Sequence, residues 1–181
     1  VDAIRLNVES AGNLLSGFSN TLGFKINAQG QRTFLNIAYA QYAKFDFDYT
    51  HLIRFDDRNA LALHADLGVA YPYGNSTVLP FEKRYFSGGA NSVRGWGVRE
   101  LGPGGYKGND GRIDFINQTG DLKFDLNAEY RTSLFWKFEG ALFVDAGNIW
   151  TLRNYADQPN GQFKIDKFYK QIAAAYGMGI R

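Results

Sequence analysis

Apolar and polar residues alternate along residues 120–133, GDLKFDLNAEYRTS. Leu122, Phe124, Leu126, Ala128 and Tyr130 fall on one side, and Lys123, Asp125, Asn127, Glu129 and Arg131 on the other. Successive side chains of a β-strand point to opposite faces, so this period of two predicts a strand with one apolar and one charged face.

The same alternation recurs in other segments of the chain. It is clear in residues 41–57, 59–74 and 134–150, and weaker in residues 3–10 and 170–181. In the segment 134–150 it places Trp136, Phe138, Leu142, Val144 and Ala146 on one face of a strand. Together these segments predict an all-β protein of about six long strands without a convincing helix.

The alternation fits two orientations. In a soluble barrel or sandwich the apolar face would point inward, whereas in a transmembrane barrel it would meet lipid and the charged face would line a wet lumen. Strands longer than the roughly 5 to 6 residues usual in soluble proteins favour the membrane. So do aromatic residues near the segment ends, as in an interfacial girdle, and one loop, about residues 78–120, far longer than the other links. These aromatic residues are Tyr42, Tyr71, Tyr73, Trp136 and Trp150.

Composition narrows the function classes. The 181 residues suit one domain, and a formal net charge of +2 gives no reason to expect nucleic acid as a partner. The absence of cysteine excludes disulfides and thiolate metal sites, and 21 glycines with 16% aromatic residues favour strands and turns. The chain opens within a strand pattern, so we expect the true N-terminus to lie elsewhere.

The long loop carries the most unusual stretch, FSGGANSVRGWGVRELGPGG at residues 86–105, which contains Val93, Arg94, Gly95 and Trp96. A strand that reads Phe-x-Asp-x-Gly follows, with Phe143, Asp145 and Gly147, and Glu129 stands on the strand directly after the loop. In this order the residues resemble the outer-membrane protein insertase family, the BamA/TamA-type barrels with a bacterial surface antigen domain. The family has Val-Arg-Gly followed by an aromatic residue, more often Phe or Tyr than Trp.

The resemblance implies a C-terminal fragment of a sixteen-stranded, antiparallel transmembrane β-barrel in the outer membrane of a Gram-negative bacterium. Residues 1–181 would form a single barrel-domain fragment, with an extracellular loop at about 78–120 that folds into the lumen. The implied work is non-enzymatic assembly of client β-barrel proteins, or polypeptide translocation, without cofactor or metal. The implied partners are outer-membrane lipid and lipopolysaccharide, the clients and accessory assembly subunits.

The strand pattern then indicates what Arg94 reaches. If the apolar faces meet lipid, Glu129, Phe143 and Asp145 point into the lumen, where unpaired carboxylates would be costly. The planar guanidinium of arginine binds carboxylates through two bonds and keeps its charge. We expect Arg94 to bind Asp145, with Glu129 close by, Phe143 against its aliphatic stem, and Trp96 supplying contact area.

Other functions stay open at this point. A barrel enzyme, such as an outer-membrane lipase or acyltransferase, would need a Ser-His-acid set that the sequence does not assemble. A passive pore or adhesin would not need Arg94 bound to Asp145, and a secretion transporter of the same family is poorly separated from an assembly factor. His51 and His64 lie on different strands and lack a third partner at metal-ligand spacing.

Overall fold

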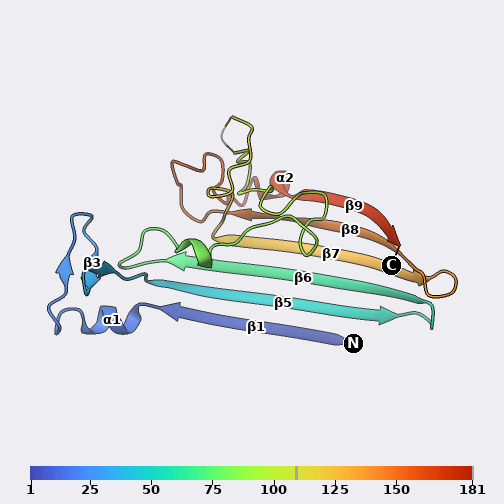
Figure 1. Cartoon of the computed structure of the whole chain (residues 1–181), viewed down its shortest axis with the longest axis horizontal. Helices are drawn as coiled ribbons and strands as arrows, with labels where there is room; N and C mark the ends of the chain where they lie inside the picture. Colours follow the sequence, from blue (N-terminus) through green and yellow to red (C-terminus); the bar gives the residue numbers. More distant parts are fainter. Residues whose placement is uncertain (109, 181) are drawn as a thin grey trace.

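Six long antiparallel strands form one sheet in the computed structural model, which describes residues 1–108 and 110–180. The strands are β1 (Asp2–Ala11), β5 (Tyr42–Arg54), β6 (Asn59–Pro72), β7 (Leu122–Ser133), β8 (Glu139–Trp150) and β9 (Ala173–Ile180). They lie side by side in chain order (Figure 1), and within the described residues β1 and β9 are the edges of an open sheet. The predicted all-β fold with about six long strands is confirmed.

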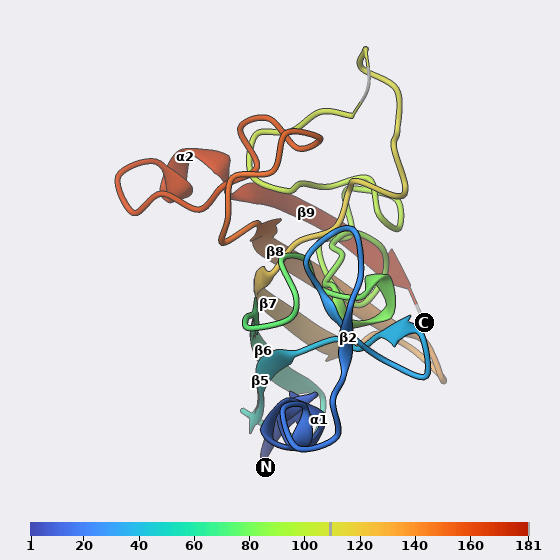
Figure 2. The same ribbon diagram turned by 90° about the vertical axis from the view of Figure 1, so that its left-hand side faces the viewer.

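The connections alternate in length. Short turns join β5 to β6 and β7 to β8 at one end of the sheet, and long segments at 12–41, 73–121 and 151–172 make the other links at the opposite end (Figure 1). Seen along the strands, the sheet is curved, and the segment 73–121 lies over one of its faces (Figure 2). Short turns at one end and long loops at the other are typical of outer-membrane barrels.

The two faces of the sheet differ in chemistry as the alternation predicts. Polar side chains lie beneath the segment 73–121, including the fully buried carboxylates of Asp125 and Asp145. The opposite face carries a continuous array of exposed apolar side chains: Ile4, Leu6, Val8, Phe45, Leu67, Leu126, Leu142, Val144, Tyr176, Met178 and Ile180. A folded chain exposes so many large apolar side chains on one face where something other than water covers them, as lipid does around a barrel.

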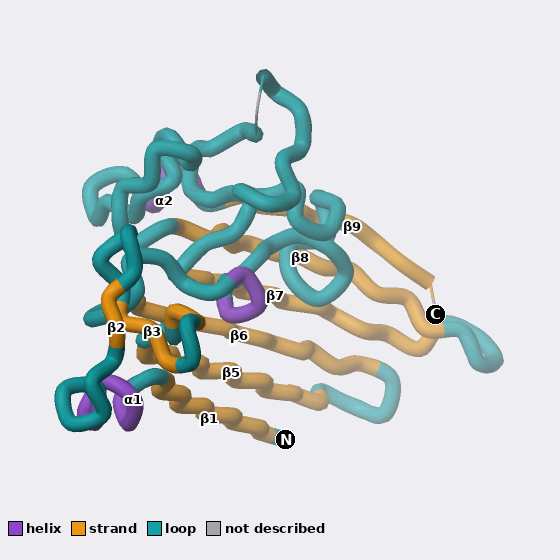
Figure 3. Tube along the Cα trace, turned by 60° about the vertical axis from the view of Figure 1, so that its left-hand side comes forward, coloured by secondary structure: helices purple, strands orange, loops and turns teal. Residues whose placement is uncertain are grey.

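The long connections contain short elements that the alternation does not predict. They are α1 (Asn13–Phe18), α2 (Phe168–Gln171), the 3₁₀ turn η1 (Phe81–Lys83), and a small separate sheet of β2 (Lys25–Ile26), β3 (Arg32–Phe34) and β4 (Ile37–Ala38) (Figure 3). The expectation of no helix therefore fails for these short turns. None of the helices in the described part of the chain has the length and hydropathy to cross a bilayer.

Two aromatic expectations are wrong. Trp136 and Phe138 are not on a strand: β7 ends at Ser133, β8 begins at Glu139, and Trp136 is an exposed turn residue with φ 56°. Neither Trp150 nor Tyr42 is an interfacial ring. Tyr42 is 4% exposed and belongs to a buried cluster, and Trp150 is 1% exposed and packs edge-on against Phe163 and Phe168 of the next connection. Alternation continues through a turn and past a strand end, so it misplaces residues there.

A small core holds the start of the long connection against the sheet. Tyr42, Ala70, Leu79, Tyr85 and Ile149 form one buried cluster. Gly68 on β6 leaves room for the Tyr85 ring, since a Cβ at this position would lie 2.4 Å from Tyr85 Cε1. The Tyr85 hydroxyl donates to Asp46 Oδ1 at 2.5 Å, and burial, with that bond, raises the pKa of Tyr85. Tyr85 thus docks the connection just before its glycine-rich stretch.

Candidate functional site

Arg94 is bound by two acidic side chains of the sheet. Its Nε donates to Asp145 Oδ2 and its Nη2 to Asp145 Oδ1, both at 2.8 Å, and its Nη1 donates to Glu129 Oε2 at 2.5 Å. The Arg94 backbone N–H also donates to Asp145 Oδ2, at 3.1 Å. We call this set of contacts between Arg94, Asp145 and Glu129 the Arg94 lock; it joins the loop to β7 and β8.

Phe143 completes the surroundings of the guanidinium. Arg94 Cζ lies 3.6 Å from the centroid of the Phe143 ring, within cation–π distance. The ring therefore contacts the charged head of Arg94. The sequence analysis had instead expected Phe143 to pack against the aliphatic stem. Gly177, which pairs with Phe143 across β8 and β9, makes this position possible, because a Cβ there would lie 2.6 Å from Phe143 Cζ.

The backbone around Arg94 is fixed by close packing. Val93 is completely buried in a cluster with Leu101 and Ala175, and Trp96 packs against this cluster. Gly95 passes so close to β9 that a Cβ would lie 2.9 Å from Ala175 Cβ. Each residue of the Val-Arg-Gly-Trp stretch therefore has a distinct contact: Val93 is the buried anchor, Gly95 permits close approach, and Trp96 covers the cluster.

Two parts of the glycine-rich loop cross each other beside Arg94. The Gly89 N–H donates to the Trp96 carbonyl at 2.8 Å. Gly88 has φ 98°, and a Cβ there would lie 2.2 Å from the carbonyl oxygen of Gly97. A side chain at this crossing would clash with backbone, so glycine is required.

A second anchor, which the sequence reasoning missed, lies beside the Arg94 lock. Ser92 Oγ donates to Asp125 Oδ2 at 2.6 Å, and both residues are buried. The other oxygen of Asp125 points at Gly147, its cross-strand partner, where a Cβ would lie 2.2 Å from Oδ1. Gly147 thus makes room for the carboxylate of Asp125. The alternation puts Asp125 on the same face as Glu129, but nothing in the pattern indicates Ser92 as its partner.

Asn127 links the two anchors. Its Nδ2 donates to the Ser92 carbonyl at 2.7 Å and to Asp145 Oδ1 at 2.9 Å. Lys123 lies 3.3 Å from Asp125 Oδ2, and Arg131 Nε donates to Glu129 Oε1 at 2.8 Å. A basic residue of β7 therefore lies next to each of Asp125 and Glu129.

Hydrogen bonds to Asp145 raise the pKa of Arg94 against the opposing effect of burial. Its positive charge is therefore permanent, and the site is a structural ion-pair network.

The two histidines are placed differently. His64 lies on β6 in the polar wall, with Asp48 and Asn127 as partners, whereas His51 on β5 contacts Asp2 of β1. Among the described residues, no group of three or more His, Cys, Asp or Glu side chains could hold a metal ion.

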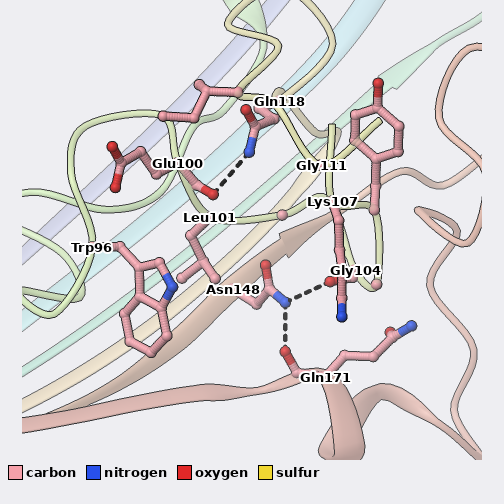
Figure 4. A pocket seen from close by; sticks show the side chains of 13 residues that line it. Trp96, Glu100, Leu101, Gly104, Lys107, Gly111, Gln118, Asn148 and Gln171 are labelled. Atoms are coloured by element: carbon pink, nitrogen blue, oxygen red, sulfur yellow. Dashed lines mark hydrogen bonds between the residues drawn. The ribbon is translucent and has the colours of Figure 1, made fainter. Parts of the chain in front are cut away.

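A cavity of about 450 Å³ lies between the glycine-rich loop and the end of α2, and Trp96, Leu101, Asn148 and Gln171 are among the residues that line it (Figure 4). Asn148 Nδ2 donates to the Gly104 carbonyl at 3.1 Å and to the Gln171 carbonyl at 2.5 Å. These bonds join the glycine-rich loop to the connection between β8 and β9. The cavity is therefore a gap within the packing of two loops.

Comparison with known proteins agrees with this architecture. Residues 15–181 match the Omp85 superfamily domain. The outer membrane protein assembly factor BamA of Neisseria meningitidis serogroup B is 30% identical over 126 residues, which are 65% of this chain and 15% of that protein. The crystal structure of BamA from Haemophilus ducreyi lacking POTRA domains 1–3 superposes with a TM-score of 0.59 at 17% identity, over 99% of this chain and 44% of that one.

The family match contains the long loop and the strands β5 to β9, and the structural match extends over 99% of the chain. The chain spans less than half the length of either BamA protein, and its open sheet corresponds to part of the BamA barrel. Homologues of this kind reside in the bacterial outer membrane and are not enzymes. The chain belongs to the Omp85 superfamily, as a segment of an outer-membrane β-barrel.

Proposed function

We propose that this chain is part of a barrel that folds and inserts client β-barrel proteins into the outer membrane, and that the Arg94 lock braces the barrel wall for this work. One observation carries the proposal: a loop arginine is bound at three nitrogens by two acids on neighbouring strands. A passive wall needs no such attachment. The relatives in sequence include a protein described as an outer membrane protein assembly factor.

The long connections support an orientation. In outer-membrane barrels the long loops are extracellular and the short turns periplasmic. The segment 73–121, with the loop at about 78–120, would then enter the lumen from the outside, while the turns after β5 and β7 face the periplasm. The exposed apolar face would contact lipid, including lipopolysaccharide in the outer leaflet.

In this function the site performs no covalent chemistry. The lock holds the loop against β7 and β8 so that the wall keeps its curvature while a seam elsewhere in the barrel opens. Client strands would pair with the seam by β-augmentation, in which backbone hydrogen bonds provide the affinity. Client proteins and accessory assembly subunits are thus the proposed partners.

The alternatives make different demands on the same residues. A pore or adhesin would tolerate loss of the lock, provided that the wall remained closed. A lipid-modifying enzyme would need a histidine beside a serine nucleophile. The histidines of this chain instead bond to Asp2 and to Asp48 with Asn127.

The experiment replaces the native gene by one that encodes the full-length Arg94→Ala variant and measures folded client barrels in the outer membrane. We expect client levels to fall while the variant itself remains present. Arg112→Ala is the matched control, because Arg112 is an exposed arginine of the same connection and lies outside the lock. Normal client assembly with the Arg94→Ala variant would refute the proposal, and channel conductance that persists without assembly would favour the pore.

A further inference from the structure

His64 faces an oxygen atom with each of its two ring nitrogens. On one side Nε2 lies 3.0 Å from Asp48 Oδ2 of β5, and on the other Nδ1 lies 2.9 Å from Asn127 Oδ1 of β7. The ring therefore bridges three neighbouring strands of the polar wall. What it can donate depends on which of its nitrogens carry protons.

The orientation of Asn127 is fixed by its other partners. Its amide nitrogen contacts the Ser92 carbonyl and Asp145 Oδ1, both of which can only accept. The nitrogen must therefore lie on that side, so the Asn127 oxygen faces His64 and accepts a hydrogen bond. The partner at the other nitrogen of His64, the carboxylate of Asp48, also only accepts.

Two acceptors require two N–H donors. A neutral imidazole has one donor nitrogen and one acceptor nitrogen, so it would place a lone pair against one of the two oxygens. The imidazolium form donates from both. The contacts of His64 thus match the doubly protonated ring, with a positive charge beside the Asp48 carboxylate.

We propose that His64 is a positioning residue that, when doubly protonated, orients Asn127 and thereby Asp145, and so makes the strength of the Arg94 lock depend on pH. The chain of contacts runs from Asp48 through His64 and Asn127 to Asp145, which binds Arg94. This inference rests on the proposed function of the lock. It adds that a residue outside the Val-Arg-Gly-Trp stretch regulates the strength of the lock.

The charged groups around His64 set the pH range. Those that line the same cavity of about 560 Å³ come from every neighbouring element: Asp48 of β5, Asp66 of β6, Lys123, Glu129 and Arg131 of β7, and Arg94 of the loop. Among these groups and His64 itself, only the imidazole of His64 is of a type that ordinarily changes its charge between about pH 5 and 8. Loss of its proton removes one of the two bonds, so the lock weakens as the pH rises through this range.

The test measures thermal unfolding of the full-length protein in detergent, across about pH 5.5 to 8, for the wild type and variants. We expect the wild type to unfold at a lower temperature at the upper end of the range. In His64→Gln this pH dependence is lost, and the variant unfolds at the acidic end at about the temperature of the wild type at the alkaline end. His51→Gln is the matched control and keeps the part of the pH dependence that His64 supplies, because His51 lies on another strand and contacts Asp2 rather than Asn127.

Two further variants keep the outcomes separate. Asp48→Asn, a substitution at a partly exposed residue, removes the need for the second proton and should flatten the profile even where His64→Gln does not fold. If both variants retain the wild-type pH dependence, the role of His64 is refuted. If Arg94→Ala unfolds like the wild type at every pH, the lock itself, and with it the proposed function, is refuted.

Discussion

Arg94→Ala tests the lock most directly, because the structure shows what the variant would lose. Three side-chain hydrogen bonds and the contact with the Phe143 ring disappear. Among the described residues, the Asp145 carboxylate, 0% exposed, then keeps the Asn127 amide and the backbone N–H of residue 94 as its only donors. Glu129 keeps its bond from Arg131.

The free-energy cost of Arg94→Ala depends on how well the two carboxylates remain hydrogen-bonded. Breaking a buried ion pair by removing one partner costs about 3–5 kcal/mol. The Arg94 side chain is 21% exposed, so the site is not fully buried and we expect the lower end of this range, about 3 kcal/mol. A loss of this size lowers the unfolding temperature by about 5 °C or more.

The assay is a double-mutant cycle on the full-length protein in detergent, with unfolding followed by heat-modifiable migration on gels and by tryptophan fluorescence. Asp145→Asn and the double variant complete the cycle, and we expect a coupling energy of about 1–3 kcal/mol between the two positions. Arg94→Lys keeps the charge but loses the two-bond geometry, so it should fall between wild type and Arg94→Ala.

Two results would refute this reasoning. If Arg94→Ala unfolds at the wild-type temperature, the lock contributes nothing to the stability of the barrel. If the effects of Arg94→Ala and Asp145→Asn simply add, the two side chains do not act as a pair in solution, whatever their distance in the structure.

The remaining predictions concern a glycine and a loop tyrosine. Gly147→Ala should lower the unfolding temperature strongly, because its Cβ would lie 2.2 Å from Asp125 Oδ1, whereas Gly179→Ala on the neighbouring strand, with no atom within 4 Å of its Cβ, should change it little; equal unfolding temperatures would contradict the role given to Gly147. Burial and the nearby Asp121 raise the pKa of Tyr155 to about 12. The unfolded state therefore loses this proton first, and folding stability should decline between about pH 10 and 12; Tyr155→Phe should lack that part of the decline in alkaline denaturation.

The sequence predicted the wall of the site better than the loop that covers it. Period-two alternation places Glu129, Phe143 and Asp145 on one face, and the strand register brings them together because Glu129 pairs directly with Phe143. Residue type and parity limit the partners of Arg94 to the acidic residues of this face, because they use only local geometry that every strand shares. The resemblance to the insertase family then singled out Asp145 and Glu129 among those acids.

The second anchor could not be inferred in this way. Ser92 and Asp125 are 33 residues apart, and their contact depends on how the loop crosses itself at Gly88. No period describes an irregular loop, and neither a buried serine nor an aspartate on a strand signals its partner. The same limitation explains the wrong placement of Trp150, whose burial depends on a connection that folds back over the strand end.

The Phe-x-Asp-x-Gly stretch acquires a physical explanation from these contacts. Its three named residues lie on the loop-covered face of β8, and each serves a different group: Phe143 stacks on the Arg94 guanidinium, Asp145 binds it, and Gly147 leaves space for Asp125. The glycine thus belongs to the second anchor rather than to the first. Arg94 is attached to Asp145 of β8 and to Glu129 of β7, and Ser92, two residues earlier on the loop, is attached to Asp125 of β7, so the loop is held at two points on this pair of strands. A loop held at two points cannot rotate about either one, which is what the proposed role of the Arg94 lock as a brace for the barrel wall requires.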